Sequence, residues 1–107
     1  MIERQSQGSQ LFLSGELTAA GLPELAAAMA AVPAGELVLE LGEMDFDDAD
    51  GSAMAGLTRL LRQRLASGEG LLLREPPQLV VHNLYRIGWH PHPLLRVEAM
   101  RQDEAYG

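Results

Sequence analysis

Cysteine and lysine are both absent from this sequence, and aromatic residues make up only 5% of it. Without cysteine the chain cannot form a disulfide framework, a thiolate zinc site or a cysteine nucleophile. It also has no run close to the ~18 apolar residues that a membrane-spanning helix needs, and no basic segment ahead of a shorter apolar run, as a signal peptide would have. We therefore expect a cytoplasmic protein that does not insert into a membrane.

Arginine supplies all eight basic residues against fifteen acidic ones, which gives a formal net charge of -7. Such a chain repels a phosphate backbone, and no basic stripe with interleaved aromatic residues is present, so nucleic-acid binding is disfavoured. Acidity by itself names no partner, because it fits both solubility and contact with a basic protein surface.

What the sequence does contain is enough apolar material for one core, since 47% of its 107 residues are hydrophobic. A chain of this length buries roughly two thirds of its extended-chain surface when it folds. Glycine and proline divide it into short elements, with no internal repeat and no long linker. We predict a single folded domain over residues 1–107.

Apolar residues recur with a strand period in some segments and with a helix period in others. Strands are predicted at residues 2–5, 10–17, 36–41, 71–73 and 92–98. Helices are predicted over about residues 22–32, 53–65 and 80–87. The mostly apolar strand at 36–41 is typical of a strand covered on both faces, Ile87 is expected in the core, and Trp89 is expected to cover it. This order predicts an α/β fold, a mixed sheet of about four to five strands with helices packed against it.

Residues 44–51, MDFDDADG, contain four aspartates within six positions: Asp45, Asp47, Asp48 and Asp50. The run joins the carboxyl end of the predicted strand 36–41 to a helix, and ligands and partners bind at that edge of open α/β sheets. Asp48 is predicted as the helix N-cap, and Asp50 as a first-turn residue at the positive end of the helix dipole. Capping does not explain the other two aspartates.

A metal site is the alternative explanation of the acidic run. An EF-hand loop would place Phe46 and Leu57 at ligand positions, so that pattern fails. A looser magnesium site stays open, because hard cations bind clustered carboxylates. His82, His90 and His92 form a second metal candidate. Helix capping is the simpler interpretation of the acidic run, so we expect no metal and no cofactor. No set of catalytic residues can be read from the sequence, so we expect no enzymatic activity.

Three segments resemble the STAS domain family, namely LFLSGELTAAGLPEL, ELVLELGEMDFDDADGSAMAGLTRLLRQRLASGEGLLL and PPQLVVHNLYRIGW. This family includes anti-sigma factor antagonists, tails of sulfate-transporter-like permeases and a small subunit of bacterial phospholipid-transport ABC systems. The resemblance implies a stand-alone STAS domain that acts as a non-catalytic protein-interaction module.

In phosphorylatable members the loop reads Asp, then twice Ser or Thr, then Gly. The matching residues here are Asp48, Ala49, Asp50 and Gly51, so neither middle position has a hydroxyl group. The resemblance therefore implies that the phosphorylation switch is absent from this loop. Asp50 instead places a permanent charge where a phosphoserine would carry roughly -1.5 to -2. Ser52, beyond the glycine, is interpreted as a first-turn helix residue.

The docking surface implied by the resemblance combines this loop with the start of the following helix. Its residues are Asp47, Asp48, Ala49, Asp50, Gly51, Ser52, Met54, Ala55, Arg59 and Arg62. The implied partner is a cytoplasmic anti-sigma factor with a kinase-type ATPase fold, which would make the chain a phosphomimetic antagonist in the regulation of transcription. The alternatives are a subunit that braces an ABC-transporter ATPase and a detached sulfate-transporter-like domain, and the oligomeric state stays open.

Overall fold

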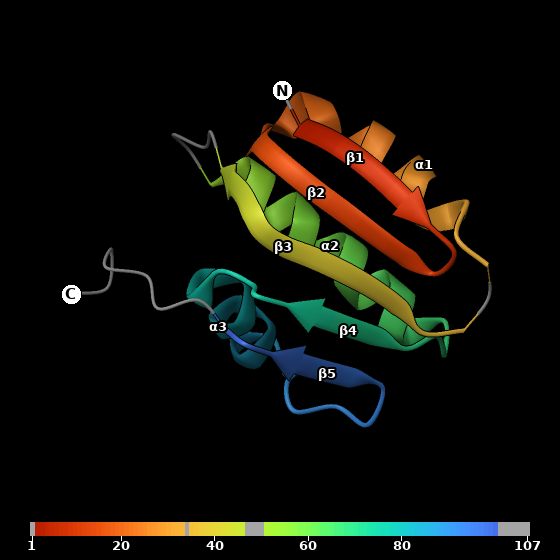
Figure 1. Cartoon of the computed structure of the whole chain (residues 1–107). Coiled ribbons are helices and arrows are strands. Elements are labelled where there is room, and N and C mark those ends of the chain that lie inside the picture. The colour runs from red at the N-terminus through yellow and green to blue at the C-terminus, as the bar shows by residue number, and fades with distance from the viewer. Residues whose placement is uncertain (1, 34, 47–50, 101–107) are drawn as a thin grey trace.

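The computed structural model describes residues 2–33, 35–46 and 51–100, which form a five-stranded sheet with helices packed against it (Figure 1). The elements are β1 (Ile2–Gln7), β2 (Gln10–Leu17), a 3-10 helix (Ala19–Gly21), α1 (Leu22–Ala30), β3 (Leu37–Phe46), α2 (Ser52–Ala66), β4 (Leu71–Arg74), α3 (Gln78–Arg86) and β5 (Leu95–Glu98). The predicted α/β class and the predicted order of elements are confirmed. Across these ranges no helix combines the length and the apolar character needed to cross a membrane.

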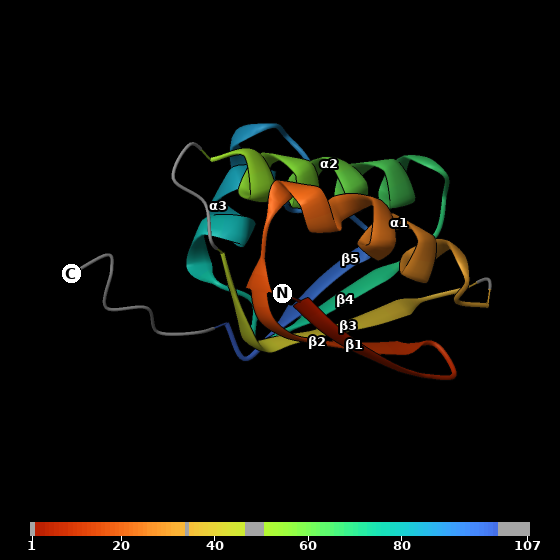
Figure 2. The ribbon, with the colours of Figure 1, turned by 90° about the horizontal axis from the view of Figure 1, so that it is seen from above.

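The strands lie in the sheet in the order in which they occur in the chain. β1 is antiparallel to β2, whereas β2, β3, β4 and β5 are parallel to one another. Each parallel step needs a crossover, which α1, α2 and α3 supply in turn. Crossovers of one hand between successive neighbours place their helices on the same face. Figure 2 shows the three helices gathered on one side of the sheet, with the other side left uncovered.

The core lies between the helices and the sheet face that they cover. Strand alternation sends every second side chain toward it, and leucine is its main residue. The buried strand residues in it are Leu11, Leu13, Leu17, Leu37, Leu39, Leu41, Met44, Leu71, Leu73 and Leu95. Those from the helices are Leu25, Met29, Ala53, Leu57, Leu61, Leu65, Val80 and Leu84. Trp89 packs against the same cluster, as predicted.

β3 is longer and more exposed than the sequence predicts. It runs to Phe46 instead of ending at Leu41, so Asp45 belongs to the strand and not to the loop. The reason is its pairing, because β3 stays paired with β2 as far as Phe46 but with β4 only as far as Glu40. The prediction that this strand is covered on both faces is wrong. Val38 and Glu40 are half-buried on the face that the helices leave open.

Two helix ends also differ from the prediction. α2 begins at Ser52 with Gly51 as its N-cap residue. The capping role predicted for Asp48 and the first-turn place predicted for Asp50 fall on residues outside those that the structure describes. Gly51 has a φ of +80°, which a glycine adopts without strain and which interrupts the helical backbone. α3 ends at Arg86, and Ile87, beyond its last turn, is 46% exposed rather than part of the core.

Candidate docking surface

Helix α2 presents one exposed stripe to solvent. Ser52, Ala55, Arg59 and Arg62 follow one another at spacings of three and four residues, which places them on the same side of the helix. All four are exposed, and the helix rises about 15 Å from the first to the last. The structure therefore brings four of the predicted docking residues together on one continuous surface.

The remaining predicted docking residues do not all lie on this stripe. Met54 is half-buried and packs against the core, so its side chain is part of the domain interior. Gly51 is exposed at the N-terminal end of the stripe. Residues 47–50 lie outside the described residues, and their role in docking stays a prediction.

The opposite side of α2 fixes which residues face outward. Leu57, Leu61 and Leu65 are buried in the core, and Gly56 faces α1. A Cβ atom added at Gly56 would lie 3.1 Å from Cγ of Leu22, so the glycine allows α1 to pack closely against α2. With one face anchored in the core, the orientation of the exposed stripe is set by packing and not by its own side chains.

Arg64 holds the C-terminal end of α2 to the sheet. Its guanidinium is buried, with Nη2 donating to the carbonyl oxygen of Gly35 at 2.8 Å and Nε donating to that of Gly70 at 3.3 Å. Nη1 also lies 3.4 Å from a carboxylate oxygen of Glu69. A buried guanidinium is tolerated when its donors have such partners. The side chain thereby ties the helix to the segments that lead into β3 and β4.

Beside the exposed stripe lies a groove between α2 and α3 with a volume of about 390 Å³. α2 lines it with Ala55, Thr58, Arg59 and Arg62, and the α3 side lines it with Asn83, Arg86 and Ile87. We call this hollow the arginine groove, since three of its side chains are arginines. The Thr58 hydroxyl donates to the carbonyl oxygen of Met54 at 2.9 Å, so it is already used within the helix.

The α3 residues of the arginine groove were not among the predicted docking residues. Asn83 and Arg86 are three positions apart, which places them on one side of a helix, and this signal was present in the sequence. The sequence pattern does not tell, however, that α3 packs beside the exposed stripe of α2.

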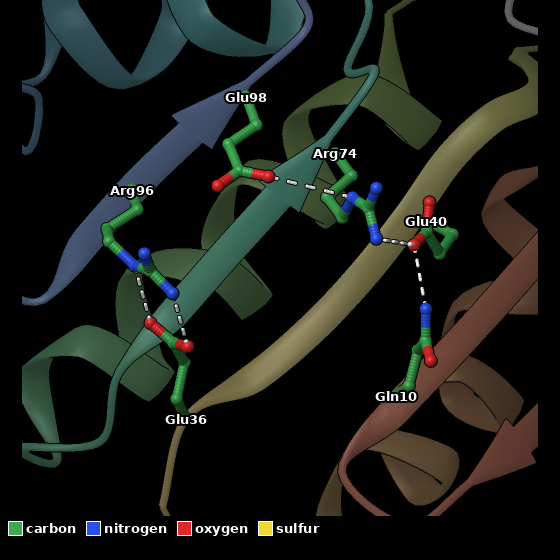
Figure 3. A network of polar contacts seen from close by, with 6 residues as sticks. All are labelled: Gln10, Glu36, Glu40, Arg74, Arg96 and Glu98. Carbon is green, nitrogen blue, oxygen red and sulfur yellow. Dashed lines mark hydrogen bonds and ion pairs between the residues drawn. The ribbon is translucent and has the colours of Figure 1, made fainter.

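A ladder of polar side chains crosses the uncovered face of the sheet (Figure 3). Arg74 on β4 lies between two carboxylates, 3.0 Å from Glu40 on β3 and 3.7 Å from Glu98 on β5. Gln10 on β2 donates to the same Glu40 oxygen at 2.7 Å. Opposite charges side by side on neighbouring strands stabilise a sheet, so this ladder links β2, β3, β4 and β5.

Arg96 and Glu36 form a second pair on this face. Two guanidinium nitrogens donate to the two carboxylate oxygens at 2.9 and 2.8 Å, the bidentate arrangement that arginine favours. The hydrogen bond from Arg96 lowers the pKa of Glu36, and in return Glu36 raises the pKa of Arg96.

The three histidines considered as metal ligands are not brought together. His92 stacks on Trp89 with ring centroids 5.2 Å apart, and its Nδ1 accepts a hydrogen bond from the backbone N–H of Leu94 at 3.1 Å. His82 and His90 line a separate hollow beside α3. Within residues 2–33, 35–46 and 51–100, no three His, Cys, Asp or Glu side chains form a group that could hold a metal ion.

Comparison with known families agrees with this architecture. A family model described as "Mlab, STAS domain" matches residues 1–96, and this range includes α2, α3 and the groove between them. The resemblance predicted from the three sequence segments is therefore confirmed. No curated protein gives a significant match to the chain.

Proposed function

Because the chain belongs to the STAS domain family, we propose that it is a non-catalytic docking module of the anti-sigma-antagonist type that binds a kinase-type ATPase. STAS domains are in general binding modules rather than enzymes. The observation that supports this proposal is the exposed stripe of α2, from Ser52 to Arg62, which directly follows the segment corresponding to the family's switch loop.

Phosphorylation cannot change the charge at positions 49 and 50 of the proposed module. Positions 49 and 50 are Ala49 and Asp50, and neither can accept phosphate from a serine kinase. Asp50 carries a permanent charge of about -1, where a phosphorylated family member would carry roughly -1.5 to -2. A kinase that binds only the unphosphorylated form would therefore bind this chain weakly, and a partner that accepts the charge would bind it constantly.

An ABC-transporter ATPase is the second candidate partner. The same absence of hydroxyl groups at Ala49 and Asp50 favours it, since a subunit that braces an ATPase needs no phosphorylation switch. Both candidates use the same surface of this chain, so the identity of the ATPase decides between them.

The test is affinity purification of the tagged chain from its native cells, with the bound proteins identified by mass spectrometry. The variants are Asp50→Arg in the loop, Arg62→Glu on the exposed stripe, and Arg74→Gln as a control on the uncovered sheet face. We expect an anti-sigma ATPase that accepts the charge of Asp50 to bind the wild type and the control, and to be lost from the other two. An ABC ATPase with the same pattern supports the second candidate. Equal recovery with all variants would show that the docking surface lies elsewhere.

A further inference from the structure

The arginine side chains of residues 8–33, 35–46 and 51–100 fall into two groups. In the first group each guanidinium lies close to a carboxylate, at 3.4, 3.0 and 2.8 Å for Arg64, Arg74 and Arg96 respectively. In the second group no carboxylate partner is found among the side chains of residues 8–33, 35–46 and 51–100. These are Arg59, Arg62 and Arg86, and all three line the arginine groove.

This arrangement leaves a concentrated positive charge on an acidic protein. Arg59 and Arg62 come from α2, and Arg86 comes from the last turn of α3. None of the groove's lining residues is acidic, although the chain has a net charge of -7. Guanidinium groups present planar forks of N–H donors that match carboxylates and phosphates. The groove is therefore complementary to an anion that its own lining residues do not supply.

Two observations favour a protein segment over a small anion. Ala55, Arg59 and Arg62 belong both to the groove and to the exposed stripe, so a partner on the stripe also reaches the groove. The rim carries Ile87, which is 46% exposed. A bare phosphate would leave this apolar side chain in water, whereas a peptide with an apolar residue among its carboxylates would cover it.

We propose that the arginine groove binds an acidic segment of the partner protein, with carboxylates on the three arginines and an apolar side chain against Ile87. The inference rests on the docking function proposed above and extends the docking surface from α2 to α3. Asn83 supplies a further amide to the same segment.

The probe for this test is the synthetic peptide EELEEL with blocked ends, titrated into the isotope-labelled chain and followed by NMR of backbone and arginine Nε–H signals. Arg86→Gln and Arg74→Gln are the matched variants, because each removes one positive charge and only Arg86 lines the groove. We expect shifts at Arg59, Arg62 and Arg86 in the wild type. Loss of one charge-assisted contact should weaken binding about tenfold in Arg86→Gln and leave Arg74→Gln within about twofold, with affinity falling as salt is added.

Other outcomes would overturn the inference. These are an absence of shifts in the groove, equal affinity of the two glutamine variants, and equal binding of the peptide KKLKKL. Tighter binding of inorganic phosphate or pyrophosphate than of EELEEL would assign the groove to a small anion. If Arg86→Gln does not fold, Arg86→Lys keeps the charge without the planar fork and should weaken binding by several fold.

The peptide titration is independent of the partner test. If EELEEL fails to bind while Asp50→Arg still loses an ATPase in cells, the docking function stands and the groove inference falls. If the peptide binds in the groove while Arg62→Glu retains every partner, the groove binds acidic peptides but does not serve partner docking, and both the docking surface and the assignment of the groove to the partner fall.

Discussion

Arg96 reaches across β4 to Glu36, and its two hydrogen bonds of 2.9 and 2.8 Å join the start of β3 to the edge strand β5 (Figure 3). Leu72 on β4 is paired in the sheet register with Arg96 and Val38, and it is only 7% exposed although it is on the face that the helices leave open. Long charged side chains cover apolar surface with their stems while the charged ends stay in water. The pair therefore secures an edge strand and shelters a leucine.

The Glu36–Arg96 pair makes stability depend on acid pH. The pKa of Glu36 is lowered from its ordinary 4.5 by the hydrogen bond from Arg96, so the pair stabilises the fold above pH 4.5 and this stabilisation is lost as the pH falls through the lowered pKa. We expect Glu36→Gln to reduce the melting temperature at pH 7 by no more than a few degrees, since both partners are exposed, and to have no effect near pH 2.

Glu43→Gln is the matched control for the pH measurement, because Glu43 is an exposed carboxylate on β3, the strand that Glu36 directly precedes. Thermal melts of both variants and the wild type at a series of pH values provide the comparison. A difference between Glu36→Gln and the wild type that persists undiminished at pH 2 would show that the effect is not the ion pair.

Gly56 is expected to be required for the contact between α1 and α2. Gly56→Ala should destabilise the fold by about 1–2 kcal/mol, because overpacking against Leu22 exceeds the gain in helix propensity. In a Leu22→Ala background the obstacle is gone, and the same change should stabilise by up to about 1 kcal/mol. Urea unfolding of the four proteins gives the coupling free energy, and strict additivity would contradict this account of the contact.

Arg64 is expected to be the most costly arginine to remove. Arg64→Ala removes the donor to the carbonyl oxygen of Gly35 and one of two donors to that of Gly70, which keeps the backbone N–H of Leu37. The free energy of unfolding should fall by roughly 2–4 kcal/mol. Arg62→Ala, two residues earlier but exposed, should change it by less than about 0.5 kcal/mol. Urea titrations of both variants provide the measurement. Equal effects would mean that the buried contacts contribute nothing to stability.

Asp50→Ser tests the phosphomimetic interpretation. Restoring the hydroxyl group removes the permanent charge, so affinity for a cognate anti-sigma kinase should rise and the kinase should phosphorylate the variant. Calorimetric titration and a phosphorylation assay measure the two effects, with Asp50→Asn as a control that removes the charge without adding a hydroxyl. Unchanged affinity in both variants would refute the mimic.

Divalent cations are expected to leave the stability of the chain unchanged. A ligand raises the melting temperature only if it prefers the native state, and we interpret the acidic run as part of a docking surface. Melts with Mg²⁺, Ca²⁺ or Zn²⁺ should superimpose on a melt with chelator. A rise of several degrees with one cation would assign the acidic run or the histidines to a metal site.

The local pattern of the sequence predicted the order of elements, because each strand and helix carries its own period of apolar residues. The sequence pattern did not predict features that depend on contacts between segments far apart in the chain. Glu40 is a charged residue within a mostly apolar strand. Its place is explained by Gln10 and Arg74, which contact its carboxylate from two other strands. The arginine groove was missed for the same reason, since it exists only where α3 packs beside α2.

The start of α2 shows a different limit. By residue type aspartate is preferred to glycine at an N-cap, so sequence reasoning does not point to Gly51. The positive φ of Gly51 decides, since a residue in that conformation cannot continue a right-handed helix backward. The exposed side of α2 was predictable because exposed and buried positions on one helix follow from spacing alone.

The order of the strands also has a consequence for how the chain folds. Every strand pairs with the one that precedes it in the chain, so no strand has to be inserted between two that are already paired. Each helix and strand can add to a growing sheet as it leaves the ribosome, N-terminal part first. The hydrogen bonds between Glu36 and Arg96 join residues 60 positions apart, so they can form only when the last strand is in place.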